Sequence, residues 1–289
     1  MRTYEQFKEA LIENIQERLG GAAEVMVNIV AKTNHTEEQI TIRFPESKIS
    51  PSVNLQNLFL EYQEQGDIDS VADRLEAYFN RIPDGLRIPI LTFEEARENL
   101  FYQVVSKEKN EALLKECLFR EMPNTDLVMI LRWKCGEDAS FIVKHGVAEQ
   151  IGLPEEELFK MADDNLAREE FCFQSMHELI AEMMGRDKDE LPDASPGFYV
   201  LTNKDKRYGA AMMFKHGVRG EIRLKLGCPF FILPSSTHEV LILPDNGELN
   251  PKELLAMVKE VNRTEVAAED VLSDHLYRCD LYVGVHTVL

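Results

Sequence analysis

The densest run of hydroxyl, imidazole and carboxylate side chains in the sequence is Pro234–Glu239, which lies between two apolar segments. Ser235 or Ser236, with His238 as a base, would form an activated nucleophile of the kind used by hydrolases and transferases. This chemistry requires the base within hydrogen-bond reach of the nucleophile and a third group that orients the base. We therefore take Ser235, Ser236, His238 and Glu239 as the candidate catalytic residues.

A structural interpretation of the same segment competes with the catalytic one. Neither serine stands in a G-x-S-x-G nucleophile elbow. In a turn between two strands, serine and threonine hydroxyls commonly satisfy nearby backbone groups. The sequence favours such a turn over a reaction centre at Pro234–Glu239.

A second set of candidate polar residues comprises Asn203, Asn262, Asp274 and His275. Asp274 could supply a carboxylate that orients the imidazole of His275. Adjacent residues of a strand point to opposite faces, however, so the two side chains would diverge. A turn followed by a strand is the favoured interpretation of this segment.

Metal and nucleotide sites are not predicted. The pairs His177-Glu178 and His238-Glu239 do not complete the H-E-x-x-H zinc motif, because Ala181 and Ile242 stand four residues after each histidine. The two glycine-rich motifs that bind phosphate groups, G-x-G-x-x-G and G-x-x-x-x-G-K-[ST], do not occur. The five cysteines are widely spaced, without a C-x-x-C pair, which indicates reduced thiols. We expect no cofactor and no metal.

Composition limits the classes of partner. The 289 residues are 44% hydrophobic, which suffices for a folded core, and the net charge of −19 would repel a nucleic-acid backbone. No uncharged apolar run approaches the roughly 20 residues of a membrane-spanning helix. Charged residues also interrupt the first twenty positions, unlike a secretory signal. These features predict a cytoplasmic protein that binds neither nucleic acid nor membrane.

Hydrophobic periodicity predicts a mixture of helices and strands. Helices are expected at Tyr4–Leu19, Asp67–Phe79, after Leu153 with Pro154 in first position, Gln174–Met184, Val218–Leu226 and after Asn250. Strands are expected at Glu24–Val30, Gln39–Phe44, Leu127–Trp133, Ala139–Val143, Phe198–Thr202, Gly209–Phe214, Phe230–Leu233 and Glu239–Leu243. Because these elements neither alternate strictly nor segregate, we predict an α+β fold with mixed or antiparallel sheets and packed helices.

The chain is long enough for two subdomains within one unit. We place them at residues 1–120 and 121–289. Proline, glycine and charged residues mark Arg81–Pro89 and Gly185–Gly197 as the expected linkers.

Several segments spread over the chain carry a resemblance to a known family. They are Ile49–Leu55, Tyr199–Asn203, Tyr208–Ala211, Ile232–Val240, Val261–Asn262 and Leu272–Tyr277. In the residues of these segments and in their order along the chain, the sequence resembles an uncharacterised family of anaerobic Gram-positive bacteria, a domain of unknown function. The resemblance covers nearly the whole chain and implies an α+β architecture, but it brings no activity.

Three functional hypotheses follow. The leading one is a non-enzymatic cytoplasmic binding or protein-interaction protein with an unknown protein or small-molecule partner, because no polar cluster completes a catalytic arrangement. The alternative is a hydrolase or transferase that uses the Ser/His residues at 235–239. A second alternative is an acidic decoy that mimics nucleic acid. The net charge is the only observation that supports it.

Overall fold

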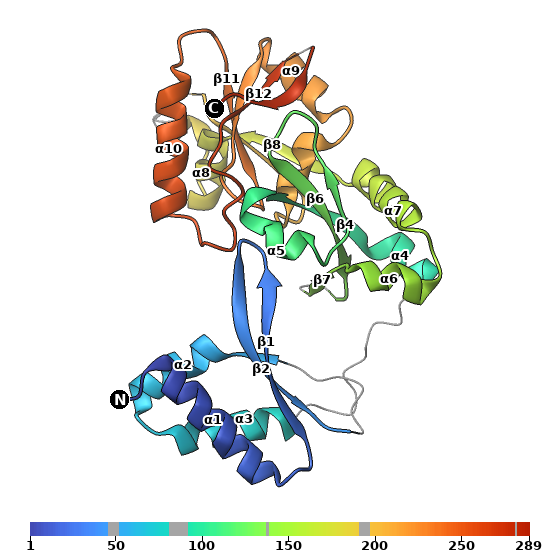
Figure 1. Cartoon of the computed structure of the whole chain (residues 1–289). Coiled ribbons are helices and arrows are strands. Elements are labelled where there is room, and N and C mark those ends of the chain that lie inside the picture. The colour runs from blue at the N-terminus through green and yellow to red at the C-terminus, as the bar shows by residue number, and fades with distance from the viewer. Residues whose placement is uncertain (46–51, 81–91, 137–138, 191–196, 281) are drawn as a thin grey trace. The chain divides into compact units, whose positions relative to one another are not determined.

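The computed structural model describes residues 1–45, 52–80, 92–136, 139–190, 197–280 and 282–289 (Figure 1). Contacts between Cα atoms divide the chain into two compact units, Met1–Ile90 and Leu91–Leu289. Each unit is described by itself below. The expected linker Arg81–Pro89 lies outside the described residues, as do residues 191–196 of the second expected linker and residues 49–51 of the first resembling segment.

The division between the compact units falls before residue 120. The strand β4 (Leu100–Ser106) pairs along its whole length with β6 (Leu127–Lys134), so strands on both sides of residue 120 share one sheet. Residues 91–120 therefore belong with the second unit.

In its described residues, the first unit packs three helices with a three-stranded antiparallel sheet. Its elements are α1 (Tyr4–Leu19), β1 (Glu24–Lys32), β2 (His35–Arg43), β3 (Ser52–Asn54), α2 (Leu55–Gln65) and α3 (Ile68–Asn80). Helix α1 buries Phe7, Leu11 and Ile15, which recur every four residues along one face. The Thr3 hydroxyl caps its start and Gly20, at φ 54°, ends it, so its bounds match the prediction.

The second unit contains two further antiparallel sheets with helices around them (Figure 1). The first sheet and its neighbours comprise α4 (Phe93–Asn99), β4, η1 (Glu108–Asn110), α5 (Glu111–Leu114), β5 (Phe119–Glu121), β6, β7 (Ser140–Ile142), α6 (His145–Ile151) and α7 (Glu155–Arg168). The second comprises β8 (Phe171–Ser175), α8 (Met176–Met184), η2 (Lys188–Glu190), β9 (Tyr199–Asn203), η3 (Gly209–Phe214), α9 (Val218–Leu226), β10 (Phe230–Leu233), β11 (Val240–Pro244), α10 (Pro251–Thr264), β12 (Tyr277–Asp280) and β13 (Gly284–Thr287). The strand orders are β4-β6-β5, with β7 also on β6, and β13-β12-β10-β11-β9-β8.

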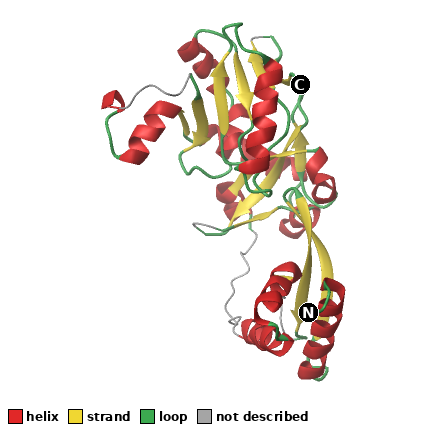
Figure 2. Cartoon of the chain, turned by 90° about the vertical axis from the view of Figure 1, so that its left-hand side faces the viewer, coloured by secondary structure: helices red, strands yellow, loops and turns green. Residues whose placement is uncertain are grey.

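Both faces of the six-stranded sheet are covered. Figure 2 shows α10 lying across one face, where Leu254 and Val258 pack with Phe231. The neighbouring strand residues Phe230 and Ile232 belong to the main core, which also includes residues of the other sheet. Because side chains alternate along a strand, this apolar run faces two cores.

The predicted α+β fold is confirmed, since the unit cores combine helices with open antiparallel sheets. The strands β1, β2, β6, β7, β9, β10 and β11 lie at their expected places, shifted at the ends by up to a few residues. Asn250 caps α10 and Pro251 is its first residue, as predicted. Pro154, expected as the first residue of a helix, instead lies one position earlier, immediately before α7. Within the described residues, no helix has both the length and the apolar character needed to cross a bilayer.

The expected strand Gly209–Phe214 is wrong. The segment forms the 3₁₀ helix η3, whose residues from Gly209 to Met213 are all buried. A Cβ atom on Gly209 would lie 2.3 Å from Thr202 Oγ1, so glycine alone fits this close approach. The apolar composition of the segment indicated burial correctly, but burial does not distinguish a strand from a tight helical turn.

Candidate functional site

The second unit contains a cavity of about 490 Å³, within the size range of small-molecule sites. Its walls come from α4, from β6 and β7, from the end of α7 and from the turn that follows β9. Segments from several elements therefore converge on this cavity, and it contains Asn203 of the predicted polar residues.

Strand register brings a basic side chain to each of two successive positions on one face of β6. Arg132 lies opposite Phe101 of β4, and Lys134 lies opposite Ser140 of β7. Trp133, between the two cations, points to the other face and is fully buried in the core. Phe101, Lys134 and Ser140 line the cavity, so this face of the sheet forms one of its walls.

Arg132 is the most unusual group beside the cavity. Its guanidinium donates to Gln103 Oε1 at 2.9 Å, to Ser140 Oγ at 3.1 Å and to the Ser140 carbonyl at 3.1 Å. It also stacks over the Tyr208 ring, with Cζ 4.8 Å from the ring centroid. Burial lowers the pKa of Arg132, and in the described part of the chain its hydrogen-bond acceptors are all neutral.

A carboxyl group faces the same cavity from the end of α7. Glu169 Oε1 accepts a hydrogen bond from Asn203 Nδ2 at 2.5 Å, and the Lys215 ammonium donates to the Glu169 carbonyl. Burial raises the pKa of Glu169, and Asp205 adds to this effect, against the opposing hydrogen bond from Asn203. Asn203 also bonds both backbone groups of Arg207, which fixes the turn after β9.

His238 lies behind this turn, with both ring nitrogens occupied. Nδ1 accepts from the backbone N–H of Tyr208 at 3.0 Å, and Nε2 lies 3.1 Å from Asp270 Oδ1. Because a backbone N–H can only donate, Nδ1 carries the lone pair and Nε2 carries the hydrogen that it donates to Asp270. The ring is therefore held as one neutral tautomer.

The structure brings Ser236 and His238 together through the main chain. Ser236 Oγ accepts from the backbone N–H of His238 at 3.1 Å, which is a local turn contact. Among the described residues, no hydrogen bond joins the His238 ring to Ser235, Ser236 or Glu239. Ser235 and Glu239 are half-buried at the same turn.

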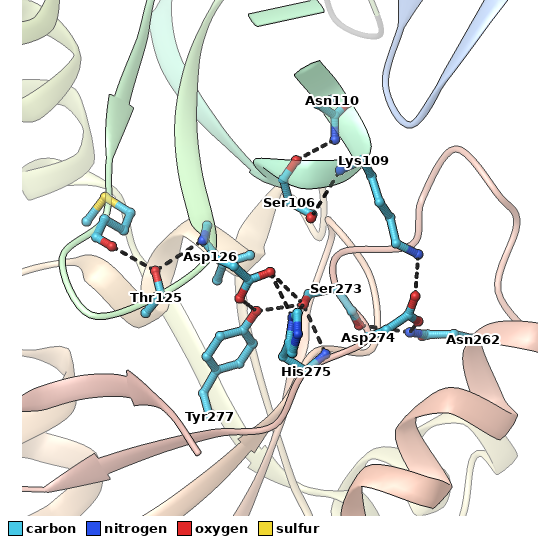
Figure 3. A network of polar contacts seen from close by, with 12 residues as sticks. Ser106, Lys109, Asn110, Thr125, Asp126, Asn262, Ser273, Asp274, His275 and Tyr277 are labelled. Atoms are coloured by element: carbon cyan, nitrogen blue, oxygen red, sulfur yellow. Dashed lines mark hydrogen bonds and ion pairs between the residues drawn. The ribbon is translucent and has the colours of Figure 1, made fainter. Parts of the chain in front are cut away.

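The remaining predicted polar residues form a separate network, which Figure 3 shows around Asp126. Tyr277 donates its hydroxyl to Asp126 Oδ1 at 2.6 Å, and His275 Nδ1 lies 3.1 Å from Asp126 Oδ2. Ser273 Oγ also lies 3.1 Å from Oδ2 and 2.7 Å from the Tyr277 hydroxyl. The carboxylate that orients His275 is therefore Asp126 and not the adjacent Asp274.

Asp274 points to other partners in this network. It pairs with Lys109 Nζ at 2.7 Å and accepts from Asn262 Nδ2 at 2.8 Å, and the same amide nitrogen donates to the Ser273 carbonyl (Figure 3). Burial alone would raise the pKa of Asp274, but the contacts with Lys109 and Asn262 outweigh it and lower the pKa. Burial, reinforced by Asp126, raises the pKa of Tyr277 far above its ordinary value.

The family was identified by comparison with known proteins. A family model described as "Family of unknown function (DUF5688)" matches residues 4–280. The chain belongs to this family. No curated protein and no solved structure matches the chain. The resemblance to an uncharacterised family over nearly the whole chain is thus confirmed, while its source in anaerobic Gram-positive bacteria stays a prediction.

Three of the segments that carry the DUF5688 resemblance meet at one point behind the cavity. Gly209 is packed so closely that a Cβ there would lie 2.5 Å from the Asn203 amide nitrogen and 2.7 Å from the His238 carbonyl oxygen. The Thr202 hydroxyl donates to that same carbonyl at 2.8 Å. The segments Tyr199–Asn203, Tyr208–Ala211 and Ile232–Val240 therefore form one packed unit.

Sequence reasoning placed Asn203 with Asn262, Asp274 and His275, but the structure puts Asn203 at the cavity and the other three in the Asp126 network. It missed Arg132, Tyr208, Asp126 and Asp270. The signal available for Arg132 was a charged residue inside an otherwise apolar strand, Leu127–Trp133. In the part of the chain that the structure describes, no three His, Cys, Asp or Glu side chains are grouped to hold a metal ion.

Proposed function

We propose that this protein binds a small anionic molecule in the cavity of its second unit, without catalysing its conversion. The observation that supports this proposal is the half-buried guanidinium of Arg132, whose hydrogen-bond acceptors, Gln103 and Ser140, are neutral. A partly desolvated cation without a carboxylate partner is costly, because buried charges are normally paired. Arg132 lies behind two lining residues, Ser140 and Tyr208, so an anion in the cavity would supply the missing negative charge through space.

The other charged groups of the cavity fit an anionic ligand. Lys134, Arg168 and Arg207 line it, and guanidinium groups suit carboxylate or phosphate oxygens because they offer paired N–H donors. Three carboxyl residues, Glu98, Glu169 and Asp205, also line the cavity and would compete with the ligand, although burial raises the pKa of Glu169 and so favours its neutral form. With as many basic as acidic residues, the lining is still richer in basic residues than the whole chain, which has 32 Lys and Arg against 51 Asp and Glu.

Two aromatic rings add a preference for a flat, apolar part of the ligand. The rings of Phe101 and Tyr208 both line the cavity, and their centroids lie 5.6 Å apart at an interplanar angle of 36°. Aromatic rings favour offset or tilted contacts with other rings at such distances. An aryl phosphate or aryl carboxylate combines the two features and is the ligand class that we propose.

The hydrolase or transferase alternative at residues 235–239 has weaker support. His238 would have to release the lone pair of Nδ1 from the Tyr208 amide before it served as a base, because Nε2 carries the hydrogen donated to Asp270. The acidic decoy stays a prediction. The cytoplasmic location also stays a prediction, and the five free cysteines support it.

Isothermal titration calorimetry with phenyl phosphate, inorganic phosphate and phenol tests the proposal. We expect wild-type protein to bind phenyl phosphate more tightly than either fragment, and Arg132→Met to weaken that binding by about tenfold or more. Arg263→Met is the matched control, because Arg263 is exposed and pairs with Glu260 on α10. Equal binding by wild type and Arg132→Met, or tighter binding of phenol, would contradict the proposal.

A further inference from the structure

We propose that His238 and Asp270 are positioning residues for the cavity, and that they act through the backbone of Tyr208. This inference rests on the proposed function for its consequence on ligand affinity. Neither residue lines the cavity, but His238 Nδ1 accepts the Tyr208 N–H at 3.0 Å and Asp270 holds the other ring nitrogen at 3.1 Å. The chain of contacts runs from Asp270 through His238 to the ring that faces Arg132.

Tyr208 needs such support because of its backbone conformation. Its φ of 55° and ψ of 23° lie in the left-handed region, which is unfavourable for residues other than glycine. A non-glycine residue remains in this region only where its surroundings hold it there, and such residues gather at functional sites. The imidazole acceptor satisfies the Tyr208 amide in this conformation.

The conformation determines where the Tyr208 side chain lies. In this conformation, the Tyr208 ring contacts the ring of Phe101 on β4 and lies under the Arg132 guanidinium. The His238 ring packs against it as well, with centroids 5.2 Å apart. A shift of the Tyr208 backbone would therefore move both a wall of the cavity and the ring on which the half-buried Arg132 guanidinium stacks.

Asp270 sets which nitrogen of His238 is the acceptor. Its carboxylate can only accept, so it keeps the hydrogen on Nε2 and leaves the Nδ1 lone pair toward Tyr208. The opposite tautomer would place a hydrogen on Nδ1 against the Tyr208 N–H, and the two donors would repel. The pair thus has a structural task that requires one tautomer, and it requires no free base.

Two substitutions of His238 separate this role from a general contribution to folding. In His238→Asn, the amide oxygen takes the place of Nδ1, so an acceptor for the Tyr208 amide is kept and the contact with Asp270 is lost. In His238→Gln, the amide nitrogen takes the place of Nε2, so the contact with Asp270 is kept and the acceptor is lost. Both variants remove the imidazole ring. They differ in whether the contact with the Tyr208 amide or the contact with Asp270 is kept.

The first readout needs no ligand. We expect the Tyr208 amide hydrogen to exchange with solvent at least tenfold faster in His238→Gln than in His238→Asn, measured by NMR at matched global stability. The second readout is affinity for phenyl phosphate, by calorimetry. We expect His238→Asn to stay within about threefold of wild type and His238→Gln to lose tenfold or more.

The outcomes distinguish this inference from the proposed function. If both variants exchange alike at Tyr208, or if affinity follows melting temperature instead of the Nδ1 acceptor, the positioning role is overturned. If the exchange rates differ as expected but wild type does not bind phenyl phosphate, the positioning of Tyr208 stands and the proposed function fails. If wild type binds and Arg132→Met does not, while His238→Gln binds normally, only the positioning inference fails.

Discussion

Two of the histidine–aspartate pairs in the second unit, His238 with Asp270 and His275 with Asp126, differ in which group is shared among several partners. His238 uses both ring nitrogens, one for the Tyr208 backbone and one for Asp270. His275 presents only Nδ1 to Asp126, and the structure gives no hydrogen bond to its Nε2 among the described residues. In the first pair the imidazole is the central group, and in the second pair the carboxylate is.

The two carboxylates, Asp270 and Asp126, also differ in how many side chains they bond and in which parts of the fold they connect. Asp270 bonds one side chain and holds a turn beside the cavity. Asp126 receives Tyr277, Ser273 and His275, and so joins the start of β6 to residues about 150 positions later in the chain (Figure 3). The same two residue types therefore orient a turn in one place and connect two sheets in the other.

The largest expected effect is on stability at Asp126. Asp126→Ala removes the carboxylate that accepts from Tyr277, Ser273 and His275 and leaves the two buried hydroxyls with only each other, so we expect it to lower the free energy of unfolding by about 3 kcal/mol. Asp270→Ala removes a single contact between partly exposed side chains and should lower it by about 1 kcal/mol. Urea denaturation monitored by circular dichroism measures both. Equal losses would remove the distinction between the two pairs.

A smaller loss is expected when one donor to Asp126 is removed. Tyr277→Phe keeps the buried ring and deletes the hydroxyl, and Asp126 still has Ser273 and His275, so we expect a loss of about 1–2 kcal/mol. Tyr282→Phe, at a side chain that is 96% exposed, is the control and should change stability by less than about 0.5 kcal/mol.

A double-mutant cycle of Asp126→Ala and Tyr277→Phe sharpens the comparison. Because the two groups share one hydrogen bond, the combined loss should be smaller than the sum of the single losses. Additive losses would mean that Tyr277 stabilises the fold by its ring alone.

These contacts also show where sequence reasoning stops. The caps at Thr3 and Asn250 and the spacing of Phe7, Leu11 and Ile15 are local signals, and the helices they predict are present. The partner of Tyr277 stands 151 positions away, and nothing local to either residue specifies the other. Asp274 was the nearest carboxylate to His275 in sequence, but the two residues lie in a bend before β12, where Asp274 pairs with Lys109 and His275 with Asp126.

The wrong strand at Gly209–Phe214 has the same origin. Its apolar residues are buried as expected, but the close approach of Gly209 to β9 and to His238 is a tertiary constraint. The left-handed conformation of Tyr208, on which the cavity wall depends, likewise has no signature in the residue type. The sequence thus predicted the architecture, one residue of the cavity and three of the Asp126 network more readily than the geometry that joins them.

The Asp126 network and the cavity should also respond to pH in opposite directions. Asp274 tests this for the Asp126 network. Its pKa is lowered in the folded protein from a value of 3.8, so its contribution to stability is present above that value and is lost as the pH falls through the folded pKa. We expect Asp274→Asn to melt a few degrees below wild type at neutral pH and at nearly the same temperature in acid. Melting curves from about pH 7 down to about pH 2, well below the ordinary carboxyl pKa, measure this, with Asp187→Asn on the exposed loop after α8 as control. A constant difference across the range would contradict it.

Glu169 should give the smallest effect and the opposite sign. Because burial raises its pKa above 4.5, folding favours the protonated carboxyl, whose stabilising contribution is full below that value and is lost as the pH rises through the folded pKa. Gln keeps an oxygen for Asn203 without the charge, so Glu169→Gln should match wild type in acid and melt one or a few degrees higher at neutral pH. Glu170→Gln, at the exposed neighbour that pairs with Lys204, should show no such rise. A destabilised Glu169→Gln at neutral pH would mean that the cations around the cavity require a charged carboxylate, and that they are not held ready for an anion from outside.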